Sequence, residues 1–187
     1  MGRIAALEKT YDPKRVEGEV FEYWGRNGIY EEVKARLSKG PKFYFLDGPP
    51  FPSSGIPHIG TCWNKVLKDI VLRYRRHRGY NVRDQPGYDC HGLPIEIAIE
   101  KKFGFQTKKD IESFGVDRFV EECKRLAEEN SAQMSEEFKN LGVWMDWESP
   151  YMTHSNQYIE SCWWAIKRAH ERGLLEHSKK VVHWCPR

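Results

Sequence analysis

The sequence predicts an α/β fold in which helices flank a parallel sheet. Three observations lead to this expectation. Residues 42–85 read as strand, loop, helix and strand, which is the order of a βαβ unit with a right-handed crossover. A second loop, residues 86–92, leads from the second strand into another helix. Further amphipathic helical runs follow, and 187 residues are enough to bury a core without disulfides or metals.

The composition is that of a folded domain without a dominant charge. Hydrophobic residues make up 40% and aromatic residues 13%, which argues against disorder. Since 30 Lys and Arg oppose 27 Asp and Glu, nucleic-acid binding is neither demanded nor excluded. We find no membrane-length apolar run and no signal peptide at the N-terminus, so we expect a cytoplasmic protein with no membrane partner. The five scattered cysteines favour reduced thiols.

Periodicity and flanking glycines mark the first helix and the first strand. We expect a helix over residues 13–27 that Gly28 would end. Its apolar residues share one face: Val16, Val20, Phe21 and Trp24. Residues 42–47, KFYFLD, form a short apolar run between Gly and Pro residues, which is typical of a buried parallel strand.

The middle of the chain predicts a helix, a strand and a second helix. The first helix runs from His58 to Gly79 with one apolar stripe. The members of this stripe are Trp63, Val66, Leu67, Ile70 and Tyr74. Residues 80–85 form the second strand, and Pro94 opens a helix that closes near Gly104.

Caps and periodicity predict the remaining elements. A capping-box-like start at residues 107–110 opens a short helix that reaches Phe114. A long helix begins at Asp117, Ser155 caps another that ends before Gly173, and residues 180–184, KVVHW, read as a strand.

The segment FLDGPPFPSSGIPHIGTCWNK, residues 45–65, is the first candidate site. It joins a strand end to a helix N-terminus, where free backbone N–H groups and the helix dipole favour a phosphate. Gly60 would let a nucleobase or phosphate approach closely, and His58 could donate a hydrogen bond to phosphate oxygens. For an isolated H-x-G pair, a helix cap or a core histidine is the competing interpretation of His58.

The loop PGYDCHGLPIE, residues 86–96, is expected to open on the same carboxyl edge of the sheet, so the two loops can meet. Asp89, although a common turn former, can hold an ammonium ion by a charge-assisted bond. His91 could orient the loop or contact phosphate. Glu96 most simply stabilises the first turn of the following helix.

Several segments together resemble the N-terminal part of the isoleucyl-tRNA synthetases, which are class I aminoacyl-tRNA synthetases. They are DGPP before HIGT at 58–61, NKVLKDIVLRYRRHRGYNV, PGYDCHGLPIE, LGVWMDWESPYMT at 141–153 and KKVVHWCPR. The resemblance covers nearly the whole chain. It implies a HUP-like Rossmann core: residues 1–40 would be a helical extension, and residues 41–187 the first half of the catalytic domain, up to the editing insertion.

The resemblance also implies an activity and its site residues. L-isoleucine would react with ATP and Mg²⁺ and pass to tRNA(Ile), in a protein that is monomeric at full length. His58, Gly60 and Thr61 match the signature that contacts ATP, with His58 and Thr61 as catalytic positions. Asp89 matches the aspartate that binds the α-ammonium group, and Pro49 the proline that lines the amino-acid pocket.

The chain departs from the family pattern in several places. Thr61 replaces the second signature His, Tyr88 stands where Trp is common, and residues 51–54 read FPSS. We find no KMSKS loop, so we expect an N-terminal fragment with weak or no activity. Cys185 would be a zinc ligand only in a longer chain, and no metal site is claimed for this one.

Other interpretations stay open at this point. The chain could belong to a sister enzyme for valine, leucine or methionine, or to a non-catalytic module that binds tRNA or a protein partner. The basic stretch of residues 73–78 could contact tRNA, but a solvated helix end is favoured. The tryptophans at 144, 147, 163 and 164 could stack on bases, but their spacing favours core packing.

Overall fold

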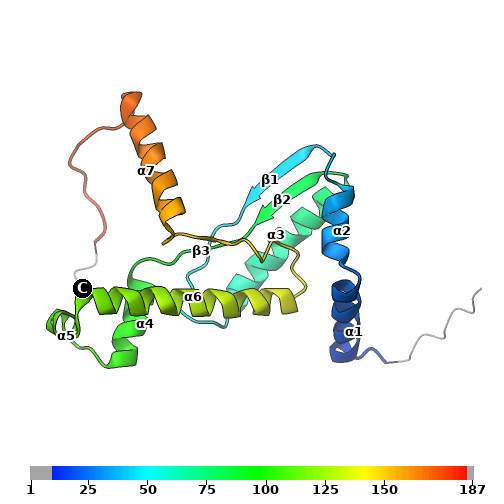
Figure 1. The fold of residues 1–187 in the computed structure, drawn as a ribbon, viewed down its shortest axis with the longest axis horizontal. Helices are drawn as coiled ribbons and strands as arrows, with labels where there is room; N and C mark the ends of the chain where they lie inside the picture. The colour runs from blue at the N-terminus through cyan, green and yellow to red at the C-terminus, as the bar shows by residue number, and fades with distance from the viewer. Residues whose placement is uncertain (1–9, 185–187) are drawn as a thin grey trace, which may run out of the picture.

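A parallel βαβ unit organises the N-terminal half of the computed structural model, which describes residues 10–184. Strand β1 (Lys42–Leu46) leads through a loop into α3 (Ile59–His77), and β2 (Asn81–Gln85) follows. The two strands pair in parallel from Lys42↔Asn81 to Leu46↔Gln85. Figure 1 shows α3 running alongside this pair. The predicted α/β unit and its parallel pairing are confirmed.

A second, very short parallel pair lies further along the chain. Strand β3 (Gly87–Tyr88) pairs with β4 (Tyr151–Met152). Neither strand was expected, because two residues are too few to show a hydrophobic period. The pair places the loop after β2 beside a segment more than 60 positions later in the chain.

The other helices follow the predicted local signals closely. They are α1 (Pro13–Arg26), α2 (Ile29–Arg36), α4 (Leu93–Phe103), α5 (Lys108–Phe114), α6 (Val116–Asn140) and α7 (Asn156–Glu171). Gly104 caps α4 in the left-handed region, α5 has the capping box, and the Ser155 side chain caps α7. Helix α2 was not predicted, and it begins directly after Gly28.

Two small hydrophobic clusters form the core. The first lies between the β3 loop and helices α4 and α6, and comprises Tyr88, Cys90, Ile95, Ala127, Met134 and Phe138. The second lies between α3, β2 and the segment after α6, and comprises Leu72, Val82, Val143 and Met145. Trp147 packs against both clusters and so connects them.

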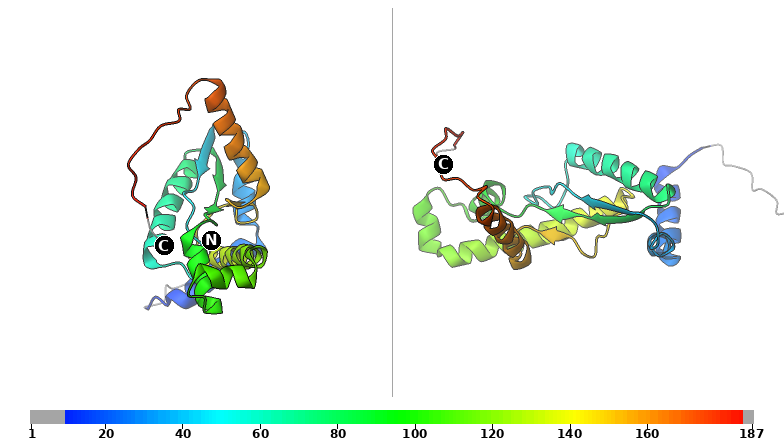
Figure 2. Two further views of the ribbon diagram at one scale, coloured as in Figure 1. Left: turned by 90° about the vertical axis from the view of Figure 1, so that its left-hand side faces the viewer. Right: turned by 90° about the horizontal axis from the view of Figure 1, so that it is seen from above.

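Several elements are less buried than the sequence suggested. Strand β1 alternates between exposed and half-buried residues, so it is not the buried strand that was expected. The apolar stripe of α3 is largely exposed, with Trp63 at 69%, whereas Lys65, Asp69, Leu72 and Arg76 are its buried residues. No residue of α7 is buried, and the helix projects away from the other elements (Figures 1 and 2).

The expected strand at residues 180–184 does not form, and Val181 is 97% exposed. This apolar segment pairs with no strand among the described residues. Within residues 10–184, no helix is both long and apolar enough to cross a membrane.

Candidate active site

The two candidate loops meet in the structure, as the sequence predicted. The backbone N–H of Asp89 donates to the carbonyl of Pro50, with an N–O distance of 2.9 Å. Pro49, half-buried, immediately precedes this contact. The bond joins the loop after β1 to the loop after β2, so the residues expected to hold an amino acid belong to one structural unit.

His58 begins α3 as its N-cap. Its Nδ1 accepts from the backbone N–H groups of Gly60 and Thr61 at 3.1 and 3.3 Å. Because Nδ1 acts as an acceptor, the proton of the neutral ring belongs on Nε2, which lies 3.0 Å from Thr61 Oγ1. The helix-cap interpretation therefore describes this geometry. The N–H groups of Gly60 and Thr61, which were expected to be free, donate to His58 instead.

Gly60 has a local reason to be glycine. A Cβ built at this position would lie 3.0 Å from Cε1 and 3.1 Å from Nδ1 of His58. The absent side chain thus makes room for the capping imidazole. This requirement is separate from the close approach of a nucleotide that the sequence suggested, and the nucleotide role stays a prediction.

Tyr88, the residue before Asp89, anchors the Asp89 loop to α6. This ring is fully buried, and its hydroxyl lies 2.7 Å from Ser135 Oγ of α6. Burial raises the pKa of Tyr88 to about 12. Cys90 is buried beside it, and burial raises the pKa of its thiol to about 11. Both side chains are therefore neutral structural groups near pH 7.

The remaining candidate residues are His91, Glu96 and Cys185. His91 Nε2 lies 2.9 Å from the carbonyl oxygen of Thr153, which agrees with the interpretation that His91 orients the loop. Glu96 lies in the first turn of α4, as expected. Cys185 falls outside the described residues. Among residues 10–184, no group of three or more His, Cys, Asp or Glu side chains could hold a metal ion.

Sequence reasoning missed a buried ion pair beside the site. Asp47, the residue after β1, accepts hydrogen bonds from Lys65 and Lys68 of α3, and both Asp47 and Lys65 are almost fully buried. Burial lowers the pKa of Lys65, although Asp47 opposes this shift. Tyr151 of β4 donates to the Asp47 carbonyl. Asp47 thereby connects β1, α3 and β4 just before the Pro49 loop.

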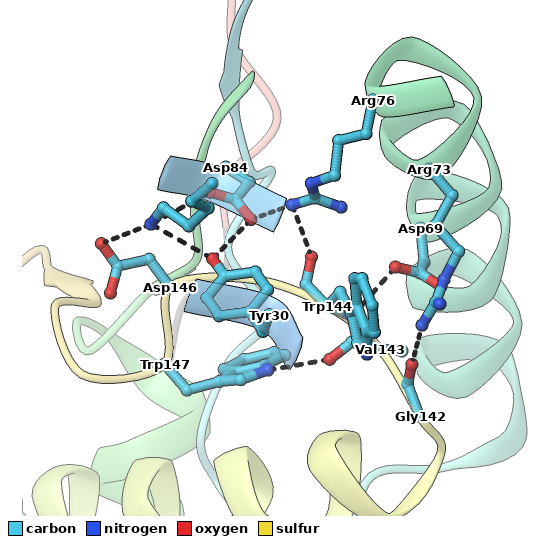
Figure 3. A network of polar contacts seen from close by, with 11 residues as sticks. Tyr30, Asp69, Arg73, Arg76, Asp84, Gly142, Val143, Trp144, Asp146 and Trp147 are labelled. Atoms are coloured by element: carbon cyan, nitrogen blue, oxygen red, sulfur yellow. Dashed lines mark hydrogen bonds and ion pairs between the residues drawn. The ribbon is translucent and has the colours of Figure 1, made fainter. Parts of the chain in front are cut away.

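A second buried network lies on the C-terminal half of α3 (Figure 3). Arg76 Nη2 donates to Asp84 Oδ2 and to the Trp144 carbonyl, and the Tyr30 hydroxyl donates to the same Asp84 oxygen at 2.7 Å. Burial raises the pKa of Asp84, although Arg76 acts in the opposite direction. Burial and Asp84 together raise the pKa of Tyr30.

This network corrects the interpretation of the basic stretch. Arg76 is buried, and Arg73 lies over the Trp144 ring with its Cζ 4.3 Å from the ring centroid. Arg75 lies over Phe43 in the same way. These three side chains are thus structural groups and not a solvated helix end, because aromatic rings or carboxylates lie against their guanidinium groups. Only Arg78 of the four arginines is exposed.

The tryptophan prediction is half right. Trp144 and Trp147 are partly buried, and Trp147 stacks on Phe138 with a centroid distance of 5.6 Å. Trp163 and Trp164 are 64% and 63% exposed on α7, so their expected core packing is wrong. Trp163 and Trp164 are adjacent on α7, and their spacing did not show that no residue of this helix is buried.

The fold and the loops define a class of protein. Residues 19–187 match the family described as tRNA synthetases class I (I, L, M and V), and the chain belongs to this family. A ternary complex of the Agrobacterium radiobacter LeuRS with tRNA and LeuAMS has the same fold, with a TM-score of 0.55 over 88% of this chain and 18% of that chain, at 24% identity.

The most similar curated proteins include particular enzymes of this class. The isoleucine–tRNA ligase of Methanothrix thermoacetophila is 55% identical over 98% of this chain. Those of Archaeoglobus fulgidus and Pyrococcus abyssi are 56% and 54% identical over 97% and 96% of the chain. The chain spans only 17% to 18% of the length of these three relatives.

Proposed function

We propose that this chain supplies the first half of an active site that activates L-isoleucine with ATP and transfers it to tRNA(Ile). The similarity to isoleucine–tRNA ligases supports this choice of amino acid. The observation that carries the proposal is the bond between Asp89 N and Pro50 O, because it places the candidate ammonium ligand against the Pro49 loop. The Asp89 carboxylate would hold the α-ammonium group by a charge-assisted bond.

In the activation step the substrate carboxylate is the nucleophile, so the protein mainly positions the two substrates. The carboxylate of isoleucine attacks the α-phosphorus of ATP in line, an O–P bond forms, and pyrophosphate leaves. His58 is oriented for a donor role, since Nδ1 accepts from the start of α3 and Nε2 keeps the proton. When a phosphate oxygen arrives, Nε2–H would exchange its present partner, Thr61 Oγ1, for that oxygen.

Other parts of the assignment extend beyond this chain. Mg²⁺ would neutralise the triphosphate, and among the described residues no cluster of three or more His, Cys, Asp or Glu side chains could hold it. Zinc binding by Cys185, a monomeric state and a cytoplasmic location stay predictions for the full-length protein.

Isoleucine-dependent exchange of pyrophosphate into ATP tests the proposal in the full-length protein. We expect isoleucine to stimulate exchange more than valine, leucine or methionine. Asp89→Ala should raise the KM for isoleucine by more than about tenfold, because a hydrogen-bonded charge is lost. Asp117→Ala, which removes an exposed carboxylate from the first turn of α6, is the matched control. Stronger stimulation by valine, or an unchanged KM in Asp89→Ala, would overturn the proposal.

A further inference from the structure

One buried residue outside both candidate loops contacts the Asp89 segment at four points. Thr153 follows β4 directly and is 5% exposed. Its backbone N–H donates to the carbonyl of Tyr88 at 3.2 Å, which extends the β3–β4 ladder by one bond. Nothing in the local sequence around residue 153 indicates this role, because its partners lie more than 60 positions earlier.

The Thr153 hydroxyl and carbonyl contact three consecutive residues of the loop. Oγ1 accepts from the backbone N–H of Cys90 at 2.8 Å and donates to Asp89 Oδ1 at 3.4 Å. The carbonyl oxygen lies 2.9 Å from His91 Nε2. A hydroxyl has one proton and can accept two bonds, so the donor and acceptor roles are compatible. One side chain therefore holds both the backbone and the carboxylate of the loop.

The contact to Asp89 has a chemical consequence. The hydroxyl bond to Oδ1 restrains the carboxylate, and a carboxylate can accept further hydrogen bonds through its second oxygen. The bond between Asp89 N and Pro50 O fixes the backbone of the same residue from the other side. Asp89 is thus held by Thr153 through its side chain and by the first loop through its backbone, and an ammonium group would meet a preorganised acceptor.

We propose that Thr153 is a positioning residue that orients Asp89 for the α-ammonium group of the amino-acid substrate. This inference rests on the proposed function of Asp89. Thr153 itself need not touch the substrate. Its effect should therefore fall on amino-acid binding and leave ATP binding unchanged, because its hydrogen bonds go to the Asp89 loop, whereas those of His58 go to the start of α3.

The test is a set of variants of the full-length protein, measured by isoleucine-dependent pyrophosphate exchange. Thr153→Val keeps the shape and removes the hydroxyl. We expect it to raise the KM for isoleucine about tenfold, the usual effect of losing a bond to a charged group, with the KM for ATP changed less than about threefold. Thr153→Ser should restore the KM for isoleucine. Ser131→Ala removes another buried hydroxyl, one that bonds within α6, and is the matched control.

A double-variant cycle separates positioning from general destabilisation. If Thr153 acts through Asp89, adding Thr153→Val to Asp89→Asn should raise the KM for isoleucine little further. Additive effects, an equal rise in the KM for ATP, or no rescue by serine would overturn the inference. If Thr153→Val does not fold, Thr153→Ala takes its place both alone and in the Asp89→Asn background, with the same expected and contradicting results.

The outcomes also distinguish this inference from the proposed function. If isoleucine fails to stimulate exchange, or Asp89→Ala leaves its KM unchanged, the proposed function itself fails. If Asp89→Ala impairs isoleucine binding and Thr153→Val does not, only the positioning role is wrong.

Discussion

A buried ion pair joins α3 to strand β2. Arg76 and Asp84 form an ion pair that is almost fully buried and is completed by the Tyr30 hydroxyl. Such side chains are expected on the solvent face of an amphipathic helix. Sequence periodicity marked the apolar stripe of α3 as its inner face, whereas Lys65, Asp69 and Arg76 are among the buried residues of this helix. The pairing across α2, α3 and β2 is tertiary, so no local pattern could predict it.

Removing one partner of this pair should be costly. Asp84→Asn leaves the Arg76 cation buried without its carboxylate, and we expect the free energy of unfolding to fall by about 3 kcal/mol. Urea denaturation measures the loss. Asp117→Asn, which changes an exposed carboxylate, should stay within about 0.5 kcal/mol of the parent chain. A loss below 1 kcal/mol in Asp84→Asn would mean that water replaces the carboxylate at Arg76.

The cysteines should differ in reactivity. Burial raises the pKa of Cys90 to about 11, so only about 0.1% of this thiol is ionised at pH 8. Cys162 is exposed on α7. We expect iodoacetamide to label Cys162 at least about tenfold faster, and the Cys90 rate to rise with each pH unit up to about 11. Mass spectrometry after timed quenching measures both rates, and urea should abolish the difference. Equal rates in the folded chain would contradict the burial of Cys90.

At the scale of elements, local signals predicted most helices and the first strand pair. The caps at Ser155 and Thr107 and the stop at Gly104 act through neighbouring residues, and the structure confirms them. The β3–β4 pair was missed because its partners are distant in sequence and very short. The strand expected at residues 180–184 is wrong because a short run of β-favouring residues does not by itself supply a partner strand.

The β3–β4 pair depends on the absence of a side chain at Gly87. A Cβ there would lie 2.1 Å from the Tyr151 ring. Gly87→Ala should therefore force the strands apart and lower the free energy of unfolding by about 2 kcal/mol. Gly18→Ala is the matched control, because a Cβ in the exposed α1 meets nothing within 4 Å and should stabilise the helix by about 0.5 kcal/mol. Thermal melts of both variants measure the difference, and equal melting temperatures would contradict the close packing.

The cap of α3 allows the structural and chemical roles of His58 to be separated. His58→Ala removes the acceptor for Gly60 and Thr61 and should cost about 1 kcal/mol of stability. His58→Asn supplies a strong N-cap acceptor and should keep the stability. If His58 donates to phosphate, pyrophosphate exchange in the full-length protein should nevertheless fall at least tenfold in His58→Asn. Full activity in this variant would leave His58 as a helix cap alone.

At the scale of the whole molecule, large apolar surfaces remain uncovered. The exposed aromatic residues of α3 and α7 include Trp63, Tyr74, Trp163 and Trp164. Tyr44 and Leu46 of β1 are also exposed, and in the described part of the chain β1 pairs only with β2. An exposed apolar stripe such as that of α3 normally packs against another element or partner. In a protein of the relatives' length, further chain is available to cover them.

We therefore predict that the 187-residue chain alone associates through these faces. Light scattering coupled to size-exclusion chromatography should show oligomers at micromolar concentration, and a hydrophobic dye should bind. Trp63→Glu combined with Trp163→Glu should shift the population toward monomer, because charge on an apolar face opposes its burial. Tyr23→Glu, which changes an exposed aromatic residue on α1, should not. A monomeric chain without dye binding would show that these faces are stable in water, and the need for a covering element would disappear.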